Sequence, residues 1–141
     1  MTLHLRVGGA QKECHPHVRV GGSWRTVQEA FVRVGGGWRR FYVALTASAT
    51  PNSASGSRTG LGYVTTNSVT VSVSGGSGSY SYAWSTPGFE VVSSGSPTTA
   101  FRFFADAVPT SQNASATCTV TDTVSGATAT VSVPCSFTAT P

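Results

Sequence analysis

The sequence predicts an all-β fold in which short β-hairpin repeats are followed by an antiparallel β-sandwich. Three observations predict it. A glycine-containing unit recurs about every 13 to 14 residues near the start of the chain, a spacing that suits one hairpin per copy. From Leu61 onward, short runs of alternating apolar and polar residues recur between turn-forming residues. Only 10% of the residues are charged, against about 25% in a typical soluble domain, and Ser, Thr and Gly take their place.

The repeated unit is Val-Arg-Val-Gly-Gly, followed by Ser or Gly and then by Trp-Arg. Full copies occupy residues 18–25 and 32–39, and a partial copy without the tryptophan occupies residues 5–12. Two glycines between alternating runs predict a two-residue hairpin turn, because both central positions of that turn need a positive φ. Whether the partial copy also forms a hairpin is left open by the sequence.

The turn fixes which residues face each other across each hairpin. Counting outward from Gly21 and Gly22 places Arg19 opposite Trp24 and Val18 opposite Arg25. The same counting in the second full copy pairs Arg33 with Trp38 and Val32 with Arg39. Each full copy then has an Arg–Trp pair on one face, suited to stacking of the guanidinium on the indole, and valines on the other.

Hairpins of this size are marginal on their own in water, so the valine faces need a neighbouring copy, another subunit or a larger assembly to cover them. We therefore expect residues 1–45 to be a docking segment. The residues expected to make assembly contacts are Arg19, Trp24, Arg33, Trp38, Arg39, Phe41 and Tyr42.

Charge divides the chain at about the same point. Residues 1–42 hold seven of the nine basic residues and two of the five acidic ones, which gives this segment +5 and the remainder −1. Residues 46–60 are rich in Ser, Thr, Ala and Gly and lack large side chains, so we expect a linker there. We expect residues 61–141 to form the sandwich.

Alternation assigns the strands of the sandwich and their inward side chains. Inward positions are Val69, Val71 and Val73 in one strand and Ala116, Cys118 and Val120 in another. The expected strands are 68–74, 80–84, 89–92, 98–104, 116–121 and 127–133, with a loop from Asp106 to Asn113 and a turn at 122–126.

Three cysteines, Cys14, Cys118 and Cys135, are an odd number, which argues against a disulfide framework. Cys118 and Cys135 flank the expected 122–126 turn about one pair out of register. Both a disulfide and two buried thiols stay open for them. Cys14 lies near His15 and His17 in an expected loop over residues 10–16. Their spacing matches no structural zinc pattern, and we expect no metal or cofactor.

No arrangement of residues indicates catalysis, so we expect a protein that is not an enzyme. The acidic residues are scattered, the histidines lie far from any nucleophile motif, and no phosphate-binding loop is present. The basic and aromatic N-terminal part raises the alternative of nucleic-acid binding. Docking on an acidic protein surface is favoured over it, since Arg and Trp are effective interface anchors.

Two stretches carry a resemblance to a known family. The runs VTVSVSGGSGSYSYAW at 69–84 and CTVTD at 118–122 resemble the paired strands of PKD-like, immunoglobulin-like (Ig-like) domains. The resemblance covers about the last 75 residues. It implies a seven-stranded antiparallel sandwich with Trp84 in the core.

The VRVGGxWR units are similar to a short repeat in virion proteins of tailed bacteriophages, especially tail-tip and fibre proteins. Ig-like domains are also common appendages of phage tail and capsid proteins. The two resemblances together imply a bacteriophage structural protein, present in several copies or as a homo-oligomer and bound to other tail proteins. The N-terminus shows no secretory signal and the chain no apolar membrane-spanning run, which agrees with a virion protein made in the host cytoplasm.

Our leading hypothesis is that the hairpins lock into the tail tip or fibre base while the Ig-like domain projects outward. The alternatives are a glycan-binding adhesin module and a capsid decoration protein. In the adhesin hypothesis, host-surface glycan would meet the loops near Phe101, Phe103 and Phe104. The loop residues proposed for that contact are Pro87, Gly88, Ser94, Gly95, Asp106 and Asn113.

Overall fold

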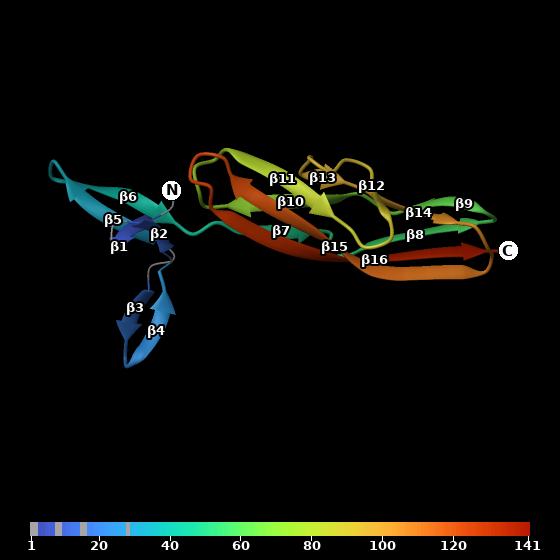
Figure 1. The fold of residues 1–141 in the computed structure, drawn as a ribbon, viewed down its shortest axis with the longest axis horizontal. Coiled ribbons are helices and arrows are strands. Elements are labelled where there is room, and N and C mark those ends of the chain that lie inside the picture. The colour runs from blue at the N-terminus through green and yellow to red at the C-terminus, as the bar shows by residue number, and fades with distance from the viewer. Residues whose placement is uncertain (1–2, 8–9, 15–16, 28) are drawn as a thin grey trace.

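The fold is all-β, as the sequence predicts. The computed structural model describes residues 3–7, 10–14, 17–27 and 29–141, with side chains described for 17–27, 29–38 and 43–141. These residues form sixteen strands and no helix. Within this part of the chain, accordingly, there is no helix of the length and apolarity needed to cross a membrane. Figure 1 shows two regions, which we name the hairpin arm (residues 3–43) and the sheet region (residues 46–141).

The hairpin arm consists of three two-stranded antiparallel sheets, one for each copy of the repeat. The partial copy pairs in the same register as the full copies, with Arg6 opposite Gln11, which answers the question that the sequence left open. The loop expected over residues 10–16 is wrong for residues 10–14, which form a strand. The strands of the arm are β1 (Leu3–Val7), β2 (Ala10–Cys14), β3 (His17–Val20), β4 (Ser23–Thr26), β5 (Glu29–Val34) and β6 (Gly37–Val43).

The sheet region contains three sheets around one core. Their strand orders are β13-β10-β7, β11-β15-β16-β8 and β12-β14-β9. The strands are β7 (Thr46–Thr50), β8 (Ala54–Thr59), β9 (Gly62–Thr65), β10 (Val69–Ser74), β11 (Tyr80–Ser85), β12 (Glu90–Val91), β13 (Thr98–Thr99), β14 (Phe101–Ala105), β15 (Thr110–Asp122) and β16 (Thr128–Thr140). All described pairs are antiparallel except β8 with β16, which is parallel. This pair departs from the purely antiparallel arrangement that we expected.

The linker expected over residues 46–60 is wrong, because this segment forms β7 and β8. β7 pairs with β10 and β8 pairs with β16, so both strands belong to the sheet region. The small residues here permit close packing. A Cβ at Gly56 would overlap the carbonyl oxygen of Thr65, so the position has room for no side chain. The sheet region therefore begins at about residue 46.

β15 and β16 form one long hairpin that extends beyond the strands expected from the sequence. The expected loop from Asp106 to Asn113 ends earlier, because β15 already begins at Thr110. In this hairpin Cys118 lies opposite Val131 and Cys135 lies opposite Ala114. The two cysteines are therefore offset by four residues, which is more than the one pair that we expected. Both cysteines are buried and free, so the alternative of two buried thiols holds. Burial raises the pKa of each thiol, while a backbone hydrogen bond partly opposes that rise.

The core contains the side chains that alternation placed inward. Val69, Cys118 and Val120 are fully buried, and Trp84 is nearly so. The indole N–H of Trp84 donates to the carbonyl oxygen of Ser96 at 2.9 Å. Its ring meets that of Phe101 edge to face, with centroids 5.3 Å apart. The expectation that Trp84 is a core residue is thus confirmed.

Asp122, at the end of β15, is fully buried and holds the β10–β11 loop in place. Its carboxylate accepts hydrogen bonds from the backbone N–H and hydroxyl of Ser77 and, at 2.9 Å each, from the backbone N–H groups of Val124 and Ser125. Burial by itself would raise the pKa of Asp122, but these hydrogen bonds outweigh it and hold that pKa well below its usual range. We call this arrangement the Asp122 clamp.

The Asp122 clamp lies where the arm enters the sheet region. A Cβ at Gly75 would overlap the carbonyl oxygen of Ala44, and one at Gly76 would lie 3.0 Å from the side chain of Leu45. The two glycines therefore let the β10–β11 loop pack directly on the chain leaving β6. Gly75 and Gly76, together with Asp122 of the CTVTD run, thus have a structural role, which is to hold the β10–β11 loop against the base of the arm.

Candidate functional site

The first candidate site is the described part of the hairpin arm, whose registers match those predicted. Arg19 lies opposite Trp24 and Val18 opposite Arg25 in the β3–β4 hairpin. The β5–β6 hairpin pairs Arg33 with Trp38 and Val32 with Arg39. In each turn the first glycine has φ 59° and the second φ 84°. These values explain why the sequence uses two glycines, since other residues adopt such angles only with strain.

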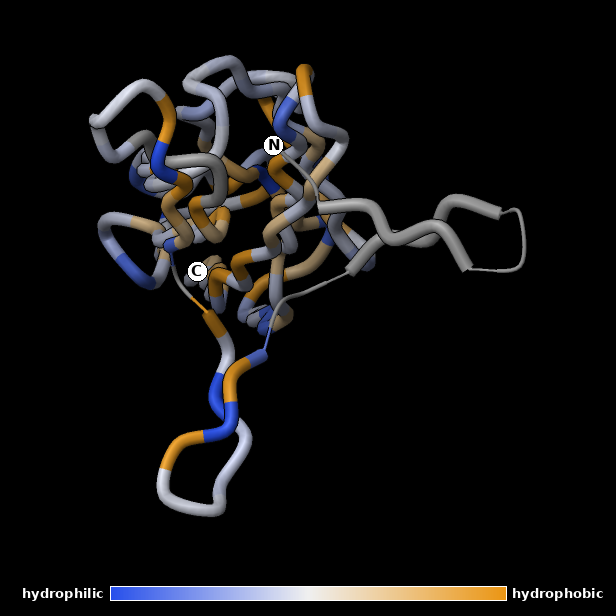
Figure 2. Tube along the Cα trace, turned by 90° about the vertical axis from the view of Figure 1, so that its left-hand side faces the viewer, coloured by the Kyte–Doolittle hydropathy of each residue, from blue (hydrophilic) through white to orange (hydrophobic). Residues whose placement is uncertain are grey.

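The apolar side chains of these two hairpins are exposed on both faces. Trp24 is 71% exposed and Trp38 is 72% exposed. On the opposite faces, Val18, Val20, Val32 and Val34 are each about half exposed. In Figure 2 the β3–β4 hairpin stands clear of the sheet region with hydrophobic and hydrophilic positions alternating along it. Neither the sheet region nor the other described hairpin covers these faces.

The Arg19–Trp24 pair has the expected register, but the expected stacking of the arginine guanidinium on the indole is not seen for it. The Nε of Arg19 donates to the carbonyl oxygen of Gly22 at 3.4 Å and so closes its own turn. Among the described side chains, the guanidinium that does stack on a ring is that of Arg102, over Tyr63. Trp24 and Trp38 remain largely exposed to solvent. Arg39, Phe41 and Tyr42, the other expected contacts, lie in β6, and their side chains are outside the described set.

The loop residues proposed for glycan contact come from four separate segments of the sheet region. Ser94 and Gly95 lie in a turn against β11, where the carbonyl oxygen of Ser94 accepts the backbone N–H of Trp84. Asn113 is not in a loop but in β15, where it lies opposite Ser136 beside a shallow hollow. Pro87 and Gly88 lie in the bend before β12, and Asp106 in the bend after β14. Of the three phenylalanines expected nearby, Phe101 is fully buried and Phe103 partly so.

A second candidate site, missed by the sequence analysis, lies on the outer face of the β12-β14-β9 sheet. We name it the aromatic face, and it consists of Tyr63, Glu90, Arg102 and Phe104. The register places Tyr63 opposite Phe104 and Glu90 opposite Arg102. Tyr63 and Phe104 are 44% and 54% exposed, with edge-to-face rings whose centroids are 5.1 Å apart.

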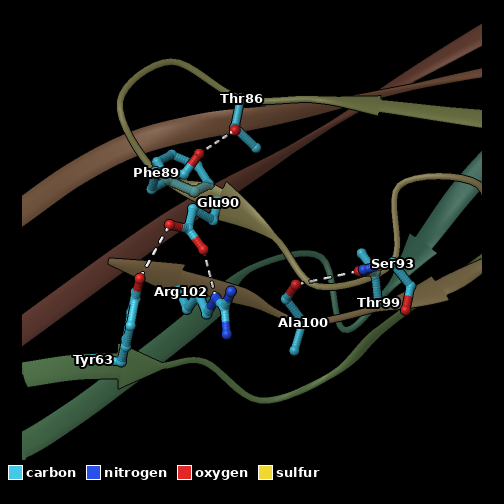
Figure 3. Close-up of polar contacts among 8 residues, drawn as sticks. All are labelled: Tyr63, Thr86, Phe89, Glu90, Ser93, Thr99, Ala100 and Arg102. Atoms are coloured by element: carbon cyan, nitrogen blue, oxygen red, sulfur yellow. Dashed lines mark hydrogen bonds and ion pairs between the residues drawn. The ribbon is translucent and has the colours of Figure 1, made fainter. Parts of the chain in front are cut away.

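The polar groups of the aromatic face are joined to its rings. The Nε of Arg102 donates to Glu90 Oε2 at 2.6 Å, and the Tyr63 hydroxyl donates to Glu90 Oε1 at 3.3 Å (Figure 3). The Arg102 guanidinium lies 4.6 Å from the centroid of the Tyr63 ring. Alternation within 62–65 and 101–105 was the available signal for these outward residues. Their register across three strands was not visible in the sequence.

Comparison with protein-family models, with curated proteins and with solved structures found no match to this chain.

Proposed function

We propose that this chain is a non-enzymatic structural protein of a bacteriophage virion, with the hairpin arm docked on the tail tip or fibre base. The sheet region, as an Ig-like domain, projects from the particle. The observation that carries the proposal is the repeated hairpin with its uncovered apolar faces. Two tandem hairpins each expose a tryptophan on one face and two valines on the other.

The energetics favour a partner for the arm. Burying a valine side chain stabilises a protein by about 1.5 to 3 kcal/mol. A partner that covered the four half-exposed valines would therefore contribute several kcal/mol to the binding free energy. Tryptophan and arginine are enriched among the residues that dominate binding energy at interfaces. The alternating sequence keeps these side chains in register on each hairpin, as an interface requires.

The charge of the arm indicates the chemistry of the partner surface. Residues 1–42 carry +5, and arginine recurs at the same place in each full copy. An acidic protein surface complements this charge, whereas arms of several copies packed only on each other would repel. Other virion proteins are therefore the proposed partners, with several copies of this chain per particle. Nucleic acid is the competing partner with the same charge complementarity.

The experiment replaces both tryptophans of the arm, Trp24→Ala with Trp38→Ala, and measures incorporation of the tagged chain into particles. We expect incorporation to fall at least tenfold while the urea unfolding midpoint of the sheet region stays unchanged, because neither ring packs on the core. Val124→Ala is the matched control, since Val124 is 75% exposed but lies in the sheet region.

Undiminished incorporation of the double variant would contradict the docking role. Electron microscopy of the gold-labelled wild-type chain would show where it sits, and a label on the capsid would favour the decoration protein. Nuclease treatment that releases the chain from particles would favour nucleic acid as the partner.

A further inference from the structure

We infer that the aromatic face is a binding site for a neutral pyranose sugar. This inference does not depend on the docking of the hairpin arm, because the aromatic face belongs to the sheet region. Figure 1 shows that β9 and β14 lie toward the end of the sheet region remote from the arm. A chain held by its arm would present this face outward.

The shape of the site follows from the short β12 strand. β12 pairs only with Phe101 and Arg102 of β14. Gly88 and Phe89, which precede β12, lie in a bend and are not part of its ladder with β14, so the ladder ends before Phe103 and Phe104. An open hollow of about 430 Å³ lies beside these residues, within the size range of small-ligand sites. Its lining is Gly88, Phe89, Glu90, Arg102, Phe103 and Phe104.

The groups around the hollow match the chemistry of a pyranose ring. One face of such a ring presents C–H groups, which pack on an exposed aromatic ring such as that of Phe104. Its hydroxyl groups both donate and accept hydrogen bonds. The Glu90 carboxylate offers acceptors and the Arg102 guanidinium offers donors, side by side at the rim.

The contacts within the aromatic face hold these groups in place before any ligand arrives. Arg102 is fixed between the Tyr63 ring and Glu90, and the Tyr63 hydroxyl binds the second oxygen of the same carboxylate. The backbone of Tyr63 is itself held by Arg58, whose Nη1 donates to the Tyr63 carbonyl oxygen at 3.1 Å. Polar groups that are already oriented lose less entropy on binding.

The charge balance selects a neutral ligand over a charged one. Glu90 and Arg102 neutralise each other at 2.6 Å, and Arg58 is directed at the carbonyl oxygens of Thr59 and Tyr63. An acidic sugar would have to compete with Glu90 for Arg102. A neutral polyol makes hydrogen bonds to the pair without separating it.

The test titrates the full chain, labelled with ¹⁵N, against the methyl pyranosides of glucose, galactose and mannose, with the methyl glycoside of sialic acid as the acidic comparison. We expect saturable shifts of the aromatic-face amides with at least one neutral sugar, at a Kd of about 1 mM. Phe104→Ala and Glu90→Gln should each weaken that binding at least tenfold. Val124→Ala is the matched control, an exposed apolar side chain removed elsewhere in the sheet region, and should leave the Kd unchanged.

Phe104→Leu serves as a second variant that keeps apolar bulk without the ring, in case the alanine variant does not fold. Weakened binding by a leucine variant whose spectrum is otherwise unchanged supports stacking on the ring. The inference is overturned by an absence of saturable shifts with all three neutral sugars, by binding of the acidic sugar alone, or by binding that a folded Phe104 variant retains in full.

Discussion

Substituting Asp122 by asparagine removes the charge of the Asp122 clamp while keeping the shape of the side chain. In the wild type, Oδ2 accepts the Ser77 N–H, while Oδ1 accepts the Ser77 hydroxyl and the N–H groups of Val124 and Ser125. An asparagine oriented to keep its oxygen at the Oδ1 position retains three of these bonds. Its NH₂ group then faces the Ser77 N–H, and this donor is left without an acceptor.

The expected loss of stability follows from these bonds. A hydrogen bond to a charged group contributes about 1.5 to 3 kcal/mol and a neutral one about 0.5 to 1.5 kcal/mol, so the three retained bonds weaken by roughly 1 kcal/mol each. The orphaned Ser77 N–H adds about 1 kcal/mol, at the low end of the range, because Ser77 is exposed to water. We therefore expect the free energy of unfolding at pH 7 to fall by about 3 to 5 kcal/mol.

The pH dependence gives the sharper test. The folded pKa of Asp122 lies below the unfolded value of about 3.9, so the wild type gains stability from this group above about pH 4. That gain is lost as the pH falls toward the folded pKa. The asparagine of the Asp122→Asn variant cannot titrate, so the difference in unfolding free energy between the two proteins should narrow between pH 7 and about pH 2.5.

Urea unfolding followed by tryptophan fluorescence measures this difference. Trp84 is the buried tryptophan of the sheet region, and Trp24 and Trp38 are too exposed to change much on unfolding. The stabilising role of the Asp122 carboxylate would be refuted if the unfolding free energies of the wild type and Asp122→Asn differed by less than about 1 kcal/mol at pH 7, or if their difference did not change with pH.

Two further predictions concern the glycines of the β10–β11 loop and the two buried cysteine thiols. Gly75→Ala should destabilise the protein by at least about 2 kcal/mol more than Gly78→Ala, measured by urea unfolding. Both glycines have positive φ, but only the Cβ at Gly75 would meet a backbone oxygen, and equal losses would contradict the close approach. In a Cys14→Ser background, Cys118 and Cys135 should react with a thiol reagent only as fast as the protein unfolds, since both are buried and their pKa values are raised. A reducing agent should leave the unfolding midpoint unchanged, and a lowered midpoint would indicate a disulfide.

The parts of the fold that were predictable are those fixed by neighbouring residues. A Gly-Gly turn sets the register of its own hairpin, so the pairing of Arg19 with Trp24 followed from counting alone. Alternation likewise identified Val69 and Cys118 as inward residues, because successive side chains of a strand point to opposite faces.

The features of the fold that we predicted wrongly or missed depend on contacts between residues far apart in the sequence. Residues 46–60 have the composition of a linker, yet β8 is a strand because it lies beside β16, more than 70 residues later. Small side chains are used there because Thr65 approaches Gly56 closely, and no local pattern reports that approach. The aromatic face was missed for the same reason. Glu90 and Tyr63 become neighbours only because β14 lies between their strands.

The hairpin arm and the sheet region use the same alternating pattern with opposite results. In the sheet region a strand such as β10 has partners on both edges, β7 and β13, and its inward valines Val69 and Val71 are buried. In the arm each described hairpin is a separate two-stranded sheet, and the described valines of the same pattern, Val18, Val20, Val32 and Val34, stay about half exposed. Alternation creates an apolar face, but a second surface is needed to bury it. Among the described residues, the chain supplies that surface for the sheet region and not for the β3–β4 and β5–β6 hairpins, and this contrast is the basis of the proposal that the arm docks on another molecule.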